Sequence, residues 1–81
     1  MNVLRVMSSE HGDKPYKWDI EKVKTGNLDA ISAIEEAERI FSESRRKGAT
    51  AFKIEKEGNK RIDEFDPNAE QIIIVPRVIG G

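Results

Sequence analysis

The sequence predicts one small α+β domain in which a mixed sheet of four to five strands packs on one long helix. The chain has 81 residues, which is enough for one hydrophobic core and too few for two. Residues 28–47 have the apolar spacing of an amphipathic helix, and the segments on either side have the patterns of strands. The predicted order is therefore strand, strand, helix, strand, strand and a last strand.

The composition excludes several classes of protein. Hydrophobic residues make up 37% and charged residues 36%, which is too polar for a membrane protein and too regularly patterned for a disordered one. Fourteen basic residues face fifteen acidic ones, so no basic excess suggests a nucleic-acid partner. With no cysteine, disulfides and thiolate metal sites are absent from this chain. We expect a cytoplasmic monomer with no membrane partner and no metal site.

The first two predicted strands form a hairpin. Residues 2–7 are rich in aliphatic side chains, with Leu4 and Val6 on one face. Residues 15–20 alternate, which places Tyr16, Trp18 and Ile20 on one face. Turn-forming residues lie between the two segments, and residues 21–26 are expected to be a polar connection to the helix.

The helix is the most strongly patterned element. Asn27 is the expected N-cap, with Thr25 as the alternative, and Asp29 lies in the first turn. The apolar residues then fall three and four apart, at Ala30, Ala33, Ile34, Ala37, Ile40 and Phe41. Basic residues at 45–47 suit the last turn because they complement the helix dipole, and Gly48 follows as the C′ residue.

The second half of the sequence predicts a further hairpin and a turn. Residues 49–56 alternate, with Ala51, Lys53 and Glu55 on one face and Phe52 and Ile54 on the other, which is typical of a strand with one solvated face. A turn at 57–59 leads to a strand at 60–65. Residues 66–69 are predicted to be a turn capped by Asp66, and the acidic residues at 63, 64 and 66 are interpreted as caps and solvated side chains.

Residues 72–75 are apolar without alternation. A strand of this kind is usually central in its sheet and covered on both faces. Because the helix would provide a right-handed crossover, we expect the first and last strands to lie side by side and parallel in the middle of the sheet.

The chain ends in Pro76-Arg77-Val78-Ile79-Gly80-Gly81, directly after the last predicted strand. Together with the order of the elements, this ending resembles the ubiquitin-like β-grasp family, which includes ubiquitin and the sulfur carriers of thiamine and molybdopterin synthesis. The resemblance implies a β-grasp domain at residues 1–76 and a flexible tail at 77–81. The motif-level resemblance covers only the tail and the last strand, and residues 66–70 match no motif of the family.

The resemblance also implies a chemistry for the tail. In that family an activating enzyme uses ATP and magnesium to adenylate the C-terminal carboxylate, which here is that of Gly81. Gly80 would supply backbone freedom because glycine has no Cβ, and Arg77, Val78 and Ile79 would line the partner's channel. The chain would be a protein modifier or a sulfur carrier, with no cofactor of its own and no catalytic role. Its partners would be the activating enzyme and target or acceptor proteins.

An alternative function is a non-catalytic interaction or assembly module. A phage tail-assembly protein also resembles this fold and has a similar small-residue ending. Such a module would bind partners through its sheet or through an exposed strand edge. Trp18 is a candidate surface anchor because tryptophan is common at binding hot spots, and its alternative place is the core beside the helix.

Overall fold

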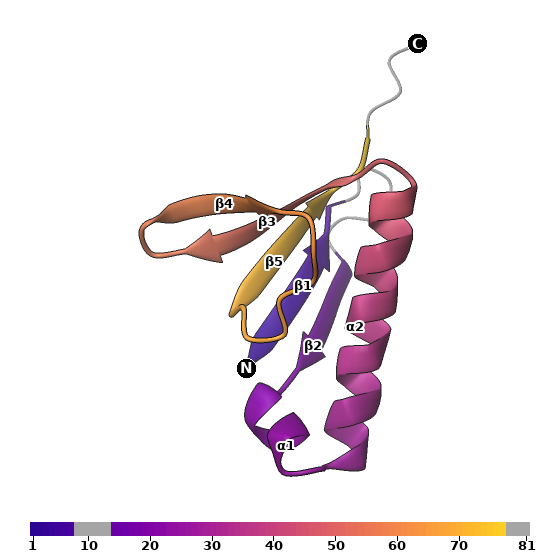
Figure 1. Ribbon diagram of the computed structural model, residues 1–81, viewed down its shortest axis with the longest axis vertical. Coiled ribbons are helices and arrows are strands. Elements are labelled where there is room, and N and C mark those ends of the chain that lie inside the picture. The colour runs from indigo at the N-terminus through magenta and orange to yellow at the C-terminus, as the bar shows by residue number, and fades with distance from the viewer. Residues whose placement is uncertain (8–13, 78–81) are drawn as a thin grey trace.

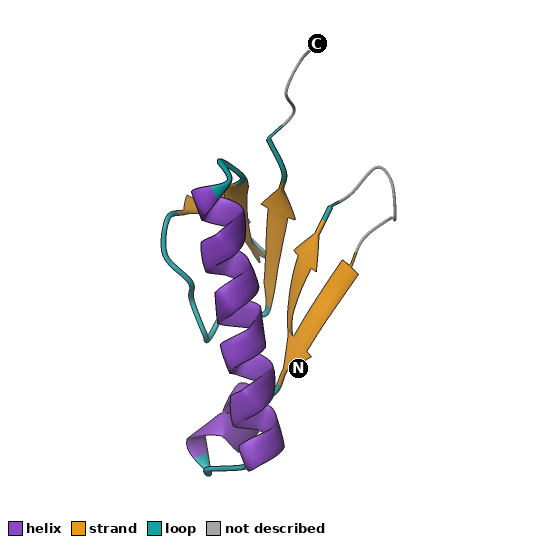
Figure 2. Ribbon diagram, turned by 90° about the vertical axis from the view of Figure 1, so that its right-hand side faces the viewer, coloured by secondary structure: helices purple, strands orange, loops and turns teal. Residues whose placement is uncertain are grey.

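The structure, a computed structural model, describes residues 1–7 and 14–77 as one α+β domain with a mixed sheet of five strands. The strands are β1 (Asn2–Val6), β2 (Lys14–Trp18), β3 (Thr50–Glu55), β4 (Gly58–Ile62) and β5 (Gln71–Val75). The helices are α1 (Ile20–Lys24) and α2 (Leu28–Arg46). The long helix α2 crosses one face of the sheet, and α1 lies beside its N-terminal end (Figures 1 and 2).

The strand order is β2-β1-β5-β3-β4, so the first and last strands occupy the centre of the sheet. β1 pairs parallel with β5, with Leu4 opposite Ile72, and it pairs antiparallel with β2. β3 pairs antiparallel with both β5 and β4. The expected parallel pairing in the middle of the sheet is therefore confirmed.

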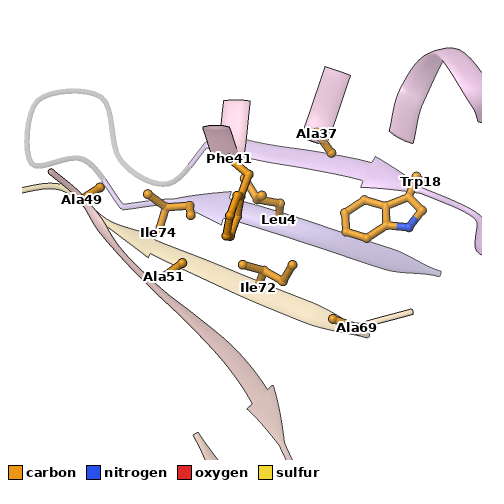
Figure 3. Packing of buried hydrophobic residues seen from close by; sticks show 9 residues of the cluster. All are labelled: Leu4, Trp18, Ala37, Phe41, Ala49, Ala51, Ala69, Ile72 and Ile74. Carbon is orange, nitrogen blue, oxygen red and sulfur yellow. The ribbon is translucent and has the colours of Figure 1, made fainter. Parts of the chain in front are cut away.

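The core lies between α2 and the central strands. Leu4, Ile72 and Ile74 are fully buried, and they face Ala37 and Phe41 of the helix (Figure 3). The aromatic rings of Trp18 and Phe41 both contact Phe65, at centroid distances of 5.3 and 5.8 Å. The predicted apolar face of the helix is confirmed, and so is the N-cap, because Asn27 Oδ1 accepts a hydrogen bond from Ala30 N at 3.0 Å.

The short helix α1 was not expected, because alternation predicted that the second strand would run to Ile20. β2 instead ends at Trp18, and Asp19 caps a helix by accepting hydrogen bonds from Glu21 N and Lys22 N. An aspartate in extended conformation with its side chain over the next amides favours a helix start over a continued strand. Ile20 leaves the strand because its amide donates to Asn2 Oδ1 at 3.1 Å.

The faces of β3 also differ from what their polarity suggests. Ala51 is fully buried under α2, although it shares its face with Lys53 and Glu55. Phe52 and Ile54 lie on the opposite face and are half-buried. The reason is the pairing with β5, which sets Ala51 opposite Ile74, and Ile74 points to the helix.

The prediction that β5 is covered on both faces is wrong for the described part of the chain. Ile72 and Ile74 are fully buried by α2. Ile73, between them, is only half-buried, and Val75 is 41% exposed. Both helices lie on one side of the sheet, and no described helix covers the other side (Figures 1 and 2).

Candidate functional site

The C-terminal tail leaves the sheet at the end of β5. Pro76 has no amide hydrogen, so the ladder of hydrogen bonds cannot continue through it. Arg77 is the last described residue. Val78, Ile79, Gly80 and Gly81 lie outside the described residues, so Arg77 is the one member of the predicted tail site that the structure places.

Arg77 packs against the end of α2. Gly48 follows the helix with a φ of +92°, the conformation that favours glycine at a helix C-terminus, and the Ala49 amide donates to Ser44 O at 3.0 Å. A Cβ added to Gly48 would lie 3.2 Å from Arg77 Cδ. The predicted C′ glycine is thus confirmed, and it also leaves room for the side chain at the root of the tail.

A cleft of about 400 Å³ lies at this root. Its apolar lining comes from Val6, Ala49, Ile74 and Pro76, and its polar lining comes from Ser44, Lys47 and Arg77. Because the lining combines apolar side chains with two cations, Lys47 and Arg77, the cleft suits contact with an apolar residue that has an acidic neighbour. Segments from three parts of the chain meet here, which spacing along the sequence could not show.

Arg45 ties the root of the tail to the far hairpin. Its guanidinium donates to Ala49 O at 2.9 Å through Nη1 and to Asp63 Oδ1 at 3.0 Å through Nη2. The sequence predicted only a favourable interaction with the helix dipole for this residue. The structure adds a side-chain link between the end of α2 and the end of β4.

A second charged cluster holds the β4–β5 connection against β3. Lys53 Nζ donates to Asp66 Oδ2 at 3.0 Å and lies 3.5 Å from Glu55 Oε1. The Asn68 amide donates to Asp66 Oδ1 at 2.9 Å, which confirms the predicted cap. Partial burial alone would raise the pKa of Asp66, but the hydrogen bonds from Lys53 and Asn68 outweigh it and lower that pKa. The same hydrogen bond raises the pKa of Lys53 against the opposing effect of its desolvation.

Of the two places predicted for Trp18, the core beside the helix is confirmed and the surface anchor is wrong. The side chain is only 1% exposed, and its Nε1 donates to Pro67 O at 2.9 Å. Alternation along β2 placed it on the correct face, but only the packing of α2 and of the connection around Phe65 decides that this face is closed.

The face of the sheet turned away from α2 is a second candidate site, which we name the open face. It carries an apolar patch on the three inner strands, made of Val3, Phe52, Ile54, Ile73 and Val75. Basic side chains flank this patch on the neighbouring positions of the same face. These are Arg5, Lys17 and Arg61, which we name the basic border.

The register of the strands sets the order of these side chains. Ile73 lies opposite Arg5 on β1 and opposite Phe52 on β3. Phe52 in turn lies opposite Arg61 on β4. One row therefore crosses four strands with an arginine at each end and two apolar residues between them.

Within residues 1–7 and 14–77, no group of three histidine, aspartate or glutamate side chains could hold a metal ion. None of the helices in the described part of the chain has the length and apolar character needed to cross a membrane. Comparisons with protein families, with curated proteins and with solved structures find no match. The functions proposed for the tail and for the open face are therefore argued from the sequence and the geometry of this chain.

Proposed function

We propose that this chain is a ubiquitin-like carrier or modifier of β-grasp fold whose Gly81 carboxylate is activated by a partner enzyme. The carboxylate is free at the end of this sequence or is freed by processing. The observation that carries the proposal is the position of the Gly80-Gly81 pair, a few residues after a central strand that is parallel to β1. The strand order, with both central strands under one long helix, supports a β-grasp architecture.

The proposed chemistry needs little from the chain itself. A carboxylate oxygen of Gly81 attacks the α-phosphorus of ATP, pyrophosphate leaves, and an acyl adenylate forms. A thiol or sulfide then attacks the carbonyl carbon and releases AMP, which gives a thioester or a thiocarboxylate. Glycines at both final positions let the backbone pass close to the nucleotide, because neither has a Cβ. ATP, magnesium and the groups that stabilise the transition state belong to the partner.

The test compares the full chain with a chain that lacks Gly81. Both are recovered from the native host and analysed by mass spectrometry of the intact protein and of tryptic peptides. A terminal thiocarboxylate on the full chain indicates sulfur carriage. A Val-Ile-Gly-Gly remnant on lysines of other proteins, produced by trypsin at Arg77, indicates conjugation.

The shortened chain should show neither product and should keep its melting temperature, since no described core residue is removed. Leu28→Ala is a suitable control, because this side chain is 81% exposed at the opposite end of α2. Activation of the shortened chain would contradict the proposal, as would an unmodified carboxylate on the full chain in every fraction.

A second candidate function is supported by the open face. An apolar patch on a sheet face that no described helix covers is typical of a surface that binds a partner. The chain would then act as an interaction module, and removal of Gly81 would leave its binding unchanged.

A further inference from the structure

β5 is apolar on both of its faces, yet α2 covers only one of them. Ile72 and Ile74 are fully buried by the helix, whereas Ile73 lies in the middle of the open face with Phe52 beside it. Val75 is exposed, and the other four residues of the patch, Val3, Phe52, Ile54 and Ile73, are half-buried. Together they form one apolar patch across three neighbouring strands. A strand with this composition is usually covered on both sides, so the open face lacks a covering layer within the described chain.

Charge is distributed unevenly around this patch. None of the described strand positions that point to the open face is acidic. These positions are Val3, Arg5, Pro15, Lys17, Thr50, Phe52, Ile54, Asn59, Arg61, Gln71, Ile73 and Val75. The whole chain, by contrast, has more acidic than basic residues. Glu55, Glu70 and the basic Lys56 line a hollow of about 430 Å³ at one end of the patch, beside Val3 and Ile54. Along the described strands, the long sides of the patch are therefore basic.

The width of the patch matches an α-helix. Arg5 and Arg61 are separated by three strand spacings, which is about 14 Å. A helix with its side chains is about 10–12 Å across. A helix lying along β5 and β3 would therefore place its apolar stripe on Ile73 and Phe52 and its two flanks beside the arginines.

Other occupants fit less well. A second copy of this chain, paired face to face, would bring two basic borders together, and like charges in close contact are unfavourable. Single-stranded nucleic acid would require several stacking aromatic residues, and Phe52 is the one aromatic residue of the patch.

We propose that the open face binds an acidic amphipathic helix of a partner protein. The apolar stripe of that helix covers Val3, Phe52 and Ile73, and carboxylates on both of its flanks pair with Arg5 and Arg61. The proposal rests on the second candidate function and names the partner for it. It does not depend on the chemistry of the tail.

A designed peptide serves as the probe. It is a helical peptide of about 18 residues, five turns, with leucine along one face and glutamate on both flanks of that face. The control peptide has lysine in place of each glutamate. Both are titrated into the full, ¹⁵N-labelled protein, and the amide shifts are followed by NMR. We expect the glutamate peptide to shift the amides of β1, β3 and β5 and to bind at least about tenfold more tightly than the lysine peptide.

Neighbouring residues of β4 provide a matched pair of variants. Arg61 points to the open face, whereas Lys60 points to the other face, and both are exposed. Arg61→Glu and Lys60→Glu change the net charge equally in the same strand. We expect Arg61→Glu to weaken the glutamate peptide about five- to tenfold, and Lys60→Glu to change its affinity less than about twofold. Arg5→Glu should act in the same direction as Arg61→Glu.

The possible outcomes distinguish the acidic helix from the second candidate function, on which it rests, and from the activation of Gly81, on which it does not depend. If both peptides bind the patch equally, the sheet remains a binding surface and the acidic partner is overturned. If neither peptide shifts the patch, the acidic helix and the second candidate function both fail. If the protein self-associates on sedimentation and its open-face amides shift with concentration, a second copy is the occupant and the proposal is wrong. A chain lacking Gly81 should bind the peptide as the full chain does, whatever the result for activation.

Discussion

Individual polar side chains join segments of this domain that are far apart in the sequence. Asn2 is buried, yet its Nδ2 donates to Ala69 O at 2.7 Å and its Oδ1 accepts from the Ile20 amide. Trp18 makes the corresponding link to Pro67. In the described residues no buried side-chain nitrogen or oxygen lacks a partner, so these bonds fix the connections without leaving an unsatisfied group.

Two glycines with positive φ, Gly48 and Gly26, allow the contact between Gly48 and Arg77 to be tested by substitution. Gly48→Ala and Gly26→Ala should each cost about 1 kcal/mol, because both residues have positive φ, at +92° and +81°. Only Gly48 has Arg77 against it, whereas the space around Gly26 is open. Cleavage by trypsin after Arg77 should therefore be faster in Gly48→Ala and unchanged in Gly26→Ala, as followed by mass spectrometry. Equal rates in both variants would show that Gly48 does not position Arg77.

Asp66 gives the domain a dependence on pH. Its pKa is lowered below the ordinary value of 3.8, so its stabilising contribution is present above that value and is lost as the pH falls through the lowered pKa. The pKa of Lys53 is raised above 10.5, so its contribution is present below that value and is lost as the pH rises through the raised pKa. The difference in unfolding free energy between the natural chain and Asp66→Asn should therefore be largest at neutral pH and smaller in acid and in strong alkali.

Urea unfolding at about pH 3, 7 and 11 measures this difference. Glu64→Gln removes an exposed carboxylate nearby and is the control, with an expected change within about 0.5 kcal/mol at neutral pH. A constant difference across the three pH values would mean that the Lys53–Asp66 pair is not formed in solution.

Among the elements, α2 covers the sheet with apolar side chains whose burial differs along the helix. Phe41 is 3% exposed at the centre of the contact, Ile34 is half-buried, and Leu28 at the first turn is 81% exposed. From the spacing of apolar residues alone, all three would be assigned to the same apolar face of the helix. Only the angle at which the helix crosses the sheet decides how deeply each is buried.

Alanine substitutions along α2 should follow this gradation. Phe41→Ala should cost about 3–5 kcal/mol, Ile34→Ala less, and Leu28→Ala close to nothing. Because a domain of this size has a total stability of only several kcal/mol, the first variant should be largely unfolded in mild urea. Chemical denaturation with circular dichroism gives the order. A larger loss at Ile34 than at Phe41 would contradict the orientation of the helix.

For the whole molecule, the central pair of strands is the most protected part. β1 and β5 are paired on both sides and lie under α2, whereas β4 is an edge strand whose side chains are mostly exposed. The hairpin of β3 and β4 also extends away from the helix (Figure 1). Stability is therefore expected to fall from the centre of the sheet toward β4.

Hydrogen exchange measures this distribution. Amides of β1 and β5 should exchange slowest and with the free energy of global unfolding, while the outer amides of β4 should exchange by local opening. Binding of the acidic peptide proposed above should slow exchange in β3 and β5 more than in α2. Faster exchange in β5 than in β4 would mean that the parallel pair is not the centre of the fold.

Elements whose signals are local could be predicted from the sequence. The cap at Asn27, the apolar face of α2, the C′ glycine at Gly48 and the turn at Asp66 all depend on residues a few positions apart, so their patterns are visible along the chain. The aliphatic run of β5 also indicated a central strand, and its parallel pairing with β1 followed from the rules of chain connection.

Which faces of the strands are closed depends on contacts between distant parts of the chain. Alternation shows that two faces exist, but only the pairing of β3 with β5 turns Ala51 to the core and Phe52 to the open face. Likewise, only the packing of α2 and Phe65 buries Trp18, and only the approach of β5 to the end of α2 brings Arg77 to Gly48. These contacts join residues that are distant in the sequence, and local patterns carry no information about them.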